Sequence, residues 1–306
     1  LPQRNWRFSG GLLFAPKYIQ IAAYLPTKKI YGFGEHLHNT LMHNLTKYVT
    51  WGMLARDQPP DAYRPQQNLY GVHPFYLALE NDGNAHGVLI WNSNAQEVTL
   101  GPWPHLVYRT IGGMLDITFF PGPKPEDVIK QYLTFIGKPY LPAYFAFGFQ
   151  LCRYGYTGLD EMKAVVSRVQ KVGVPLDVVY ADIDYMERYT DFTVGKEKWS
   201  GFGNYTRKLH KDGLHVFLIF DPAIQVTSNY TPIVDALSMG AGFIEWETVD
   251  QENPDVQKLY PLVQNTTIML AVVWPDWHVA FPDFFNELTV EWWIEQFKKL
   301  HNEQVF

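Results

Sequence analysis

Cysteine is almost absent from the chain, since Cys152 is the only one in 306 residues. A single thiol excludes an intrachain disulfide and any metal site built from several cysteines. Long hydrophobic stretches are also missing. The longest uninterrupted apolar run, Ile268 to Trp274, is far shorter than the ~18 residues that a membrane span needs. The sequence therefore predicts no transmembrane segment.

Positive charge is scarce as well. The 25 lysines and arginines are outnumbered by 31 aspartates and glutamates, which gives an isoelectric point of about 5.9. No cluster of basic residues offsets this balance, so nucleic acid is not an expected partner. No GxGxxG motif follows a predicted strand, which removes the usual argument for a bound dinucleotide. The sequence therefore indicates no cofactor.

Aromatic residues, in contrast, are abundant: 10 Trp, 19 Tyr and 20 Phe make up 16% of the chain. Most such rings belong to a protein core, but their faces also suit the apolar faces of sugar rings. Glycosylation sequons are frequent too, because this composition gives roughly one by chance and the chain has four. They favour a secretory route that ends in the lysosome, at the cell surface or outside the cell. The sequons begin at Asn44, Asn204, Asn229 and Asn265.

The first half of the sequence is patterned like a β-protein. Up to about Pro121, short β-rich runs are broken by Gly, Asn and Asp, which is typical of a β-sandwich. A helix follows, with Pro125 in its first turn and Gly137 at its end. Residues 1–138 are therefore predicted to form an N-terminal β-sandwich domain. The predicted strands are 18–25, 72–80, 85–91, 105–111 and 114–120.

The second half, residues 139–306, alternates buried strands with amphipathic helices. Such an alternation implies parallel strands joined by right-handed crossovers. A doubly wound sheet and a (β/α)8 barrel both fit this pattern. The predicted strands are 143–151, 175–181 and 215–220, and the helices between them are 159–172 and 203–212.

Polar side chains collect where these strands are predicted to end: Arg153 after the first, Asp182 and Asp184 after the second, and Asp221 after the third. In barrels that edge is the active face, although such residues can equally cap loops or neighbouring helices. Asp182 and Asp221 could form the carboxylate pair of a retaining glycosidase, about 5 to 5.5 Å apart. The same pair could bind a metal. Because the histidines lack HExxH spacing, we expect no metal site.

Seven short motifs occur in an order that matches a known family. They are YGFGEHLH (31–38), ARDQPP (55–60), LYGVHPFYLALE (69–80), GVLIWNSNAQEV (87–98), ADIDYM (181–186), FDPAI (220–224), and VWPD followed by FPDF (273–284). No single motif would suffice, but together they resemble glycoside hydrolase family 31. The resemblance implies a β-sandwich followed by a TIM (β/α)8 barrel.

The resemblance also implies an activity. Members of the family are retaining exo-α-glucosidases, which remove terminal glucose from α-1,4-linked chains through a covalent glucosyl-enzyme intermediate. The expected partner is therefore an α-glucoside such as maltose, a maltooligosaccharide, glycogen or starch.

Site residues carry over from the motifs one by one. By resemblance, Asp182 binds hydroxyls of the terminal glucose and Asp221 supports that pocket, which revises the catalytic pair considered above. Asp57 belongs to a loop that reaches from the β-sandwich to the pocket mouth. The plainer alternatives are a solvated turn for Asp57 and core packing for the Trp274 ring. The other substrate-binding candidates are two apolar wall residues, Ile183 and Ile224, and the sugar-facing ring of Trp274.

The chain departs from the family pattern in three places. Asp276 stands where the family usually has the glycine of VWPG, and a side chain there is expected to alter the pocket rim or the turn. Tyr154 stands where a tryptophan is common. Residues 225–267 match poorly and are interpreted as a loop insertion after the third strand. Preference for α-1,4 or α-1,6 linkages therefore does not carry over.

The C-terminal part predicts an incomplete barrel. A helix over 289–302 is expected to lead into a fourth barrel strand, and the nucleophile and the acid/base are expected beyond Phe306. About three of eight βα units are then present, and such a barrel does not close. Two hypotheses follow. The chain is an inactive piece of an α-glucosidase, or it is a non-catalytic carbohydrate-binding protein derived from the same family. Open parallel strand edges speak against the second, because they invite aggregation.

Overall fold

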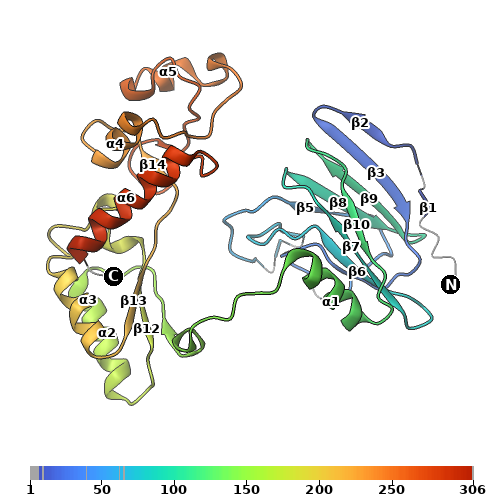
Figure 1. The fold of residues 1–306 in the computed structure, drawn as a ribbon, viewed down its shortest axis with the longest axis horizontal. Coiled ribbons are helices and arrows are strands. Elements are labelled where there is room, and N and C mark those ends of the chain that lie inside the picture. Colours follow the sequence, from blue (N-terminus) through green and yellow to red (C-terminus); the bar gives the residue numbers. More distant parts are fainter. Residues whose placement is uncertain (1–6, 9, 39, 62, 65, 305–306) are drawn as a thin grey trace. The chain divides into compact units, whose positions relative to one another are not determined.

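The computed structural model describes residues 7–8, 10–38, 40–61, 63–64 and 66–304 (Figure 1). The chain divides into two compact units, Leu1–Tyr140 and Leu141–Phe306. Each unit has its own sheets and its own hydrophobic core.

Two antiparallel sheets make up the first unit (Figure 1). The strands expected from the β-rich runs are all present, each slightly shorter than predicted. One sheet has the order β1-β3-β9-β8-β5, with β2 paired to β3, and consists of β1 (Arg7–Phe8), β2 (Leu13–Ala15), β3 (Tyr18–Tyr24), β5 (Val49–Met53), β8 (Gln96–Gly101) and β9 (His105–Thr110). The other has the order β10-β7-β6-β4 and consists of β4 (Ile30–Gly32), β6 (Phe75–Leu79), β7 (Ala85–Ile90) and β10 (Ile117–Phe120).

One hydrophobic core contains residues from both sheets. In β5, Val49, Trp51 and Met53 are buried while the residues between them are not, as the two-residue period of a strand requires. Strand β7 is buried at every position, because the helix α1 (Pro125–Ile136) covers its other face and inserts Val128. Each large side chain buried in this way contributes roughly 1.5–3 kcal/mol.

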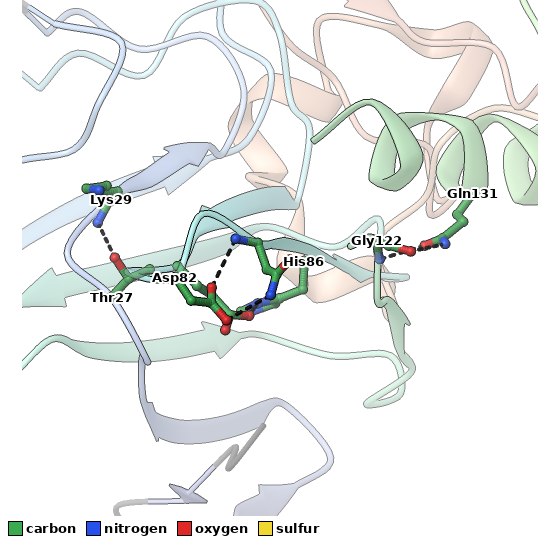
Figure 2. Close-up of polar contacts among 8 residues, drawn as sticks. Thr27, Lys29, Asp82, His86, Gly122 and Gln131 are labelled. Atoms are coloured by element: carbon green, nitrogen blue, oxygen red, sulfur yellow. Dashed lines mark hydrogen bonds and ion pairs between the residues drawn. The ribbon is translucent and has the colours of Figure 1, made fainter. Parts of the chain in front are cut away.

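The helix α1 begins and ends where its sequence predicted. Pro125 occupies the first turn and Gly137, with φ of 93°, ends the helix. Gln131 ties α1 to the turn after β10, because the Gly122 N–H donates to its Oε1 (3.0 Å) and its Nε2 donates to the Gly122 carbonyl (2.8 Å) (Figure 2). A Cβ on Gly122 would lie 2.4 Å from the Ala85 carbonyl oxygen, so this close approach requires glycine.

A three-stranded parallel sheet forms the centre of the second unit. Its order is β11 (Gln150–Leu151), β12 (Val178–Ala181) and β13 (His215–Leu218), which confirms the predicted parallel βα arrangement. The crossover helices are α2 (Leu159–Lys171) and α3 (Phe202–Lys211), and both pack on the sheet through a second core. Among the described residues the parallel strands form an open sheet and no closed barrel.

The strand predicted over 143–151 needs correction. Residues Tyr144–Phe147 form the 3-10 helix η1, and only Gln150–Leu151 pair with β12. The side-chain amide of Gln150 donates through Nε2 to the Ala146 carbonyl (2.8 Å), and this hydrogen bond holds the turn closed. The apolar run of this segment favoured a buried strand, but the turn prevents residues 144–147 from extending the ladder.

Residues 225–267 are more ordered than the predicted loop insertion. They contain helices and contribute to a third hydrophobic core, in which Ile233, Phe243 and Trp292 are buried. Strand β14 pairs antiparallel with β15 beside this core. The elements are β14 (Ile224–Gln225), α4 (Thr231–Met239), η4 (Val249–Gln251), α5 (Pro254–Gln257), η5 (Pro261–Val263) and β15 (Val279–Ala280).

The final helix, α6 (Glu287–Gln304), contains the helix predicted over 289–302 and packs against α3 and α4. None of the helices in the described part of the chain combines the length and apolar character needed to cross a bilayer.

Candidate functional site

The candidate site lies at one edge of the parallel sheet. Ala181, the last residue of β12, pairs in register with Leu218, the last residue of β13. The segments that follow these strands therefore leave the sheet at the same edge, where open α/β sheets and barrels carry their ligands. Asp182 follows β12 directly, and Asp221 lies three residues beyond β13.

Asp182 begins a short 3-10 helix, η2 (Ile183–Tyr185). Its Oδ1 accepts a hydrogen bond from the Ile183 N–H (2.7 Å), and its side chain is half-buried. Ile183 is also half-buried and packs against the second core. This hydrogen bond from the main chain of the next residue holds the carboxylate in place. The remaining lone pairs of the carboxylate can accept hydrogen bonds from a ligand hydroxyl.

The Trp274 ring is fixed by the other aspartate. Its Nε1–H donates to Asp221 Oδ2 (2.8 Å), and 42% of the residue is exposed. Core packing is therefore not the environment of this ring. An indole that is anchored by its polar edge and remains partly exposed can pack against a flat apolar ligand surface.

The sequence did not indicate Asp191, although this residue is in direct contact with Asp221. It is 2% exposed, and its Oδ1 accepts from the Asp221 N–H (3.2 Å). The Tyr230 hydroxyl donates to the Asp191 main-chain carbonyl (2.7 Å). Burial, reinforced by the negative charge of Asp221, raises the pKa of Asp191 to about 8. No sequence signal marks Asp191, because its burial depends on the loop before α3 folding back under Asp221.

The other two residues at the strand ends have structural partners. Asp184 accepts the Gly155 N–H at Oδ2 (2.7 Å), and Arg153 forms an ion pair with Glu161 (3.1 Å). Both contacts tie the loop after β11 to its neighbours. They correspond to the loop-capping alternative for these positions.

The apolar wall candidates differ in accessibility. Ile183 is half-buried, whereas Ile224 is 0% exposed and lies in the third core. Ile224 belongs to β14, where it pairs with Ala280. Its side chain therefore supports the segment after Asp221 from within the core.

Asp57 lies in the first unit, on the exposed segment after β5. The Tyr70 hydroxyl donates a hydrogen bond to its Oδ1, and this bond raises the pKa of Tyr70. The Arg56 N–H donates to the Leu69 carbonyl (3.0 Å), which fixes the main chain next to Asp57. Asp57 is thus an exposed carboxylate on a hydrogen-bonded loop, rather than on an unsupported turn.

Asp276, which is expected from the resemblance to stand in place of a glycine, forms an ion pair with Arg188. Arg188 belongs to the short helix η3 (Glu187–Tyr189) and has φ of 52°, in the left-handed region. The pair links the segment after Asp182 to the segment after Trp274. Both partners line a cleft of about 560 Å³, together with Trp277. Tyr154, the second departure from the family pattern, is an exposed ring on a neighbouring cleft.

The four sequon asparagines are all exposed. Asn265 has φ of 62°, a conformation that asparagine tolerates better than most residues. Their positions are compatible with attached glycans: Asn44, Asn204, Asn229 and Asn265. Among the described residues, no three or more His, Cys, Asp and Glu side chains are grouped so as to hold a metal ion.

Known proteins share both the sequence and the fold. The glycosyl hydrolases family 31 TIM-barrel domain matches residues 139–306. Human intestinal sucrase-isomaltase is 42% identical over 306 residues, covering 96% of this chain and 16% of the relative. Mouse lysosomal alpha-glucosidase is 39% identical over 298 residues, covering 96% of this chain and 29% of the relative. The chain thus spans less than a third of either relative.

Solved structures show the same architecture at lower identity. The glucosidase II alpha subunit has a TM-score of 0.75 at 22% identity, covering 91% of this chain and 30% of that chain. A family 31 dextranase from Flavobacterium johnsoniae has a TM-score of 0.77 at 20% identity, covering 97% of this chain and 34% of that chain. The matched domain covers more than half of the sequence, and the curated relatives align with nearly all of it. The chain therefore belongs to glycosyl hydrolase family 31.

Proposed function

We propose that this chain supplies the glucose-binding edge of a retaining exo-α-glucosidase that acts on terminal α-1,4-linked glucose. The observation that carries the proposal is the partly exposed Trp274 ring, which is held by Asp221 after β13, while Asp182 follows the neighbouring strand β12 at the same sheet edge. The names of its relatives, a sucrase-isomaltase and a lysosomal alpha-glucosidase, point to α-glucosides as the substrate class.

Each residue has a proposed role. The Asp182 carboxylate accepts hydrogen bonds from vicinal hydroxyls of glucose, and a charged acceptor makes such bonds about twice as strong as neutral ones. The Trp274 face packs against the C–H face of the sugar, and Asp221 orients the indole. By resemblance, Asp57 is also assigned to substrate binding. The apolar wall is formed by Ile183 and, through the core beneath it, Ile224.

Catalysis needs two further carboxyl groups, a nucleophile and a general acid/base. The resemblance assigns neither role to any of these 306 residues. We therefore propose that the chain by itself binds α-glucosides without hydrolysing them. Within this proposal, residues 1–138 form a β-sandwich domain and residues 139–306 contribute βα units of the catalytic barrel. The exposed sequons and the lysosomal and intestinal relatives support a place in the secretory pathway.

The binding proposal is tested by calorimetric titration of the chain with maltose. We expect Asp182→Asn and Trp274→Ala to weaken binding by about tenfold or more each, because each removes a direct sugar contact. The matched control is Asp250→Asn, since Asp250 is exposed in η4 and is not one of the proposed sugar-binding residues. Binding that is equal in all four proteins would contradict the assignment.

The reaction is tested with the protein expressed from its complete coding sequence. A retaining α-glucosidase releases the glucose that it cleaves as the α-anomer, so with p-nitrophenyl α-glucoside, whose leaving group is not a sugar, NMR is expected to show α-glucose as the first product. β-Glucose as the first product, before mutarotation, would contradict the retaining mechanism. Tight maltose binding without any hydrolysis would instead identify a non-catalytic carbohydrate-binding protein.

A further inference from the structure

We propose that Asp191 is a positioning residue for the sugar-facing ring: its carboxyl group holds the main chain of Asp221, whose carboxylate in turn holds the Trp274 indole. The identity of the bound sugar rests on the proposed function, but the positioning of the indole does not. Asp191 lies between η3 and α3, and none of the family motifs recognised in the sequence includes it.

Two consecutive hydrogen bonds make the connection. The Asp221 N–H donates to Asp191 Oδ1 (3.2 Å), and the Trp274 Nε1–H donates to Asp221 Oδ2 (2.8 Å). The main chain of Asp191 is itself fixed, because the buried Tyr230 hydroxyl donates to its carbonyl (2.7 Å). Residues that lie far apart in the sequence are thus joined in one series that runs from the interior to the exposed ring.

The titratable groups that face Asp191 come from three elements. They are Asp221 after β13, Tyr185 on η2 and Tyr230 before α4. Burial raises the pKa of both tyrosines well above 10, so they stay neutral, and the Tyr185 hydroxyl donates to the Ile219 carbonyl (3.0 Å). The remaining charge is that of Asp221, which has the same sign as an ionised Asp191.

The protonation state of Asp191 therefore affects the ring. Burial and the charge of Asp221 raise the pKa of Asp191 to about 8, so at neutral pH its carboxyl group is uncharged and lies next to Asp221 without repulsion. Above this pH, two carboxylates face each other in a buried setting. Their repulsion displaces Asp221, and the indole loses its anchor. Sugar affinity is expected to fall as the pH rises through about 8.

Two substitutions separate positioning from simple packing. Asp191→Asn keeps an acceptor oxygen for the Asp221 N–H and never ionises, so affinity should persist at neutral pH and stop falling at alkaline pH. Asp191→Ala removes the acceptor and leaves a buried N–H unsatisfied, so maltose should bind about tenfold more weakly at every pH. The control Asp250→Asn should keep both the wild-type affinity and its alkaline decline.

The experiment monitors the Trp274 ring directly by NMR and measures sugar affinity separately. The chain is labelled with 5-fluorotryptophan, the Trp274 resonance is assigned with Trp274→Phe, and ¹⁹F spectra are recorded from pH 6 to 9.5. We expect this resonance to titrate near pH 8 in the wild-type protein and in Asp250→Asn, and to stay constant in Asp191→Asn. Maltose affinity is measured across the same range.

The outcomes are distinct. A wild-type Trp274 resonance that does not titrate near pH 8 overturns the inference even if both variants fail to fold. A resonance that titrates unchanged in Asp191→Asn, or an Asp191→Ala protein with wild-type affinity, overturns it as well. A resonance that titrates as expected in a protein that binds no maltose leaves the positioning intact and contradicts the proposed function instead.

Discussion

Each of the two units buries a titratable side chain, but the partners of these two side chains belong to different parts of the structure. In the first unit, His43 is 2% exposed and its Nε2 contacts the Gly32 carbonyl (2.9 Å), so its partner is a backbone group of the sheet. In the second unit, Asp191 is equally buried, but the backbone N–H that donates to it belongs to Asp221, whose carboxylate holds the exposed Trp274. Burial favours the uncharged form of both. The partner decides whether a buried group supports the fold or a candidate site.

The comparison extends to pH. Burial lowers the pKa of His43 to about 4, and the nearby His38 and His36 act in the same direction. Burial raises the pKa of Asp191 to about 8. A fall in pH from about 6.5 to 4 therefore works against the stability of the first unit, whereas a rise in pH from about 4 to 8 works against that of the second.

The largest expected effect is a loss of kcat/KM caused by a substitution in the second unit, and it would show that the main sugar contact belongs to that unit. In the protein expressed from its complete coding sequence, Asp182→Asn should lower kcat/KM for maltose by roughly 100-fold or more, because a charged hydrogen bond that strengthens in the transition state is lost. Asp57→Asn in the first unit should cost less, since Asp57 lies on an exposed loop. Steady-state kinetics of both variants measure the difference. A greater loss from Asp57→Asn would reverse the comparison.

The second effect concerns the stability of the first unit in acid. Between about pH 6.5 and 4, unfolded His43 binds a proton that the folded form excludes, so stability falls as the pH falls, by at most ~3 kcal/mol. Hydrogen exchange of the β4 and β5 amides over this range measures the loss. His43→Gln should remove most of this dependence, whereas His210→Gln, at an exposed position in α3, should not. Protection that does not change with pH would exclude a buried neutral histidine.

The smallest effect concerns the Arg188–Asp276 ion pair of the second unit. Both side chains are well exposed, so the pair contributes less than about 1 kcal/mol. Asp276→Gly should therefore leave the melting temperature nearly unchanged. Because the pair links the segments after Asp182 and Trp274, the substitution should change the relative kcat/KM for maltose and isomaltose by about threefold or less. An unfolded variant would show that the pair is structural.

Much of the fold could be predicted because periodicity records which faces are apolar. The β-rich runs of the first half, the boundaries of α1 at Pro125 and Gly137, and the parallel strands of the second half all follow from local patterns. The segment 143–151 could not be predicted, because its apolar run favours a buried strand while a turn closed by Gln150 and Ala146 interrupts it. A single side-chain hydrogen bond across four residues is thus enough to override the apolar pattern.

The position of the candidate site could be predicted from the sequence, but the buried and loop-capping residues around it could not. The strand ends and the family motifs indicated Asp182, Asp221 and Trp274, and the structure joins the last two by a hydrogen bond. The sequence did not indicate which strand-end residues would become loop caps, as Asp184 did. It also gave no indication of Asp191, because burial beneath a distant strand end leaves no local pattern.

The central claim is that a terminal glucose binds at the edge of the parallel sheet between Asp182 and Trp274. A crystal structure of the protein soaked with glucose tests it most directly. The account predicts glucose hydroxyls within hydrogen-bond distance of the Asp182 carboxylate, a sugar face against the Trp274 ring, and the indole still bonded to Asp221. Glucose bound elsewhere, with Asp182 and Trp274 untouched, would contradict the account.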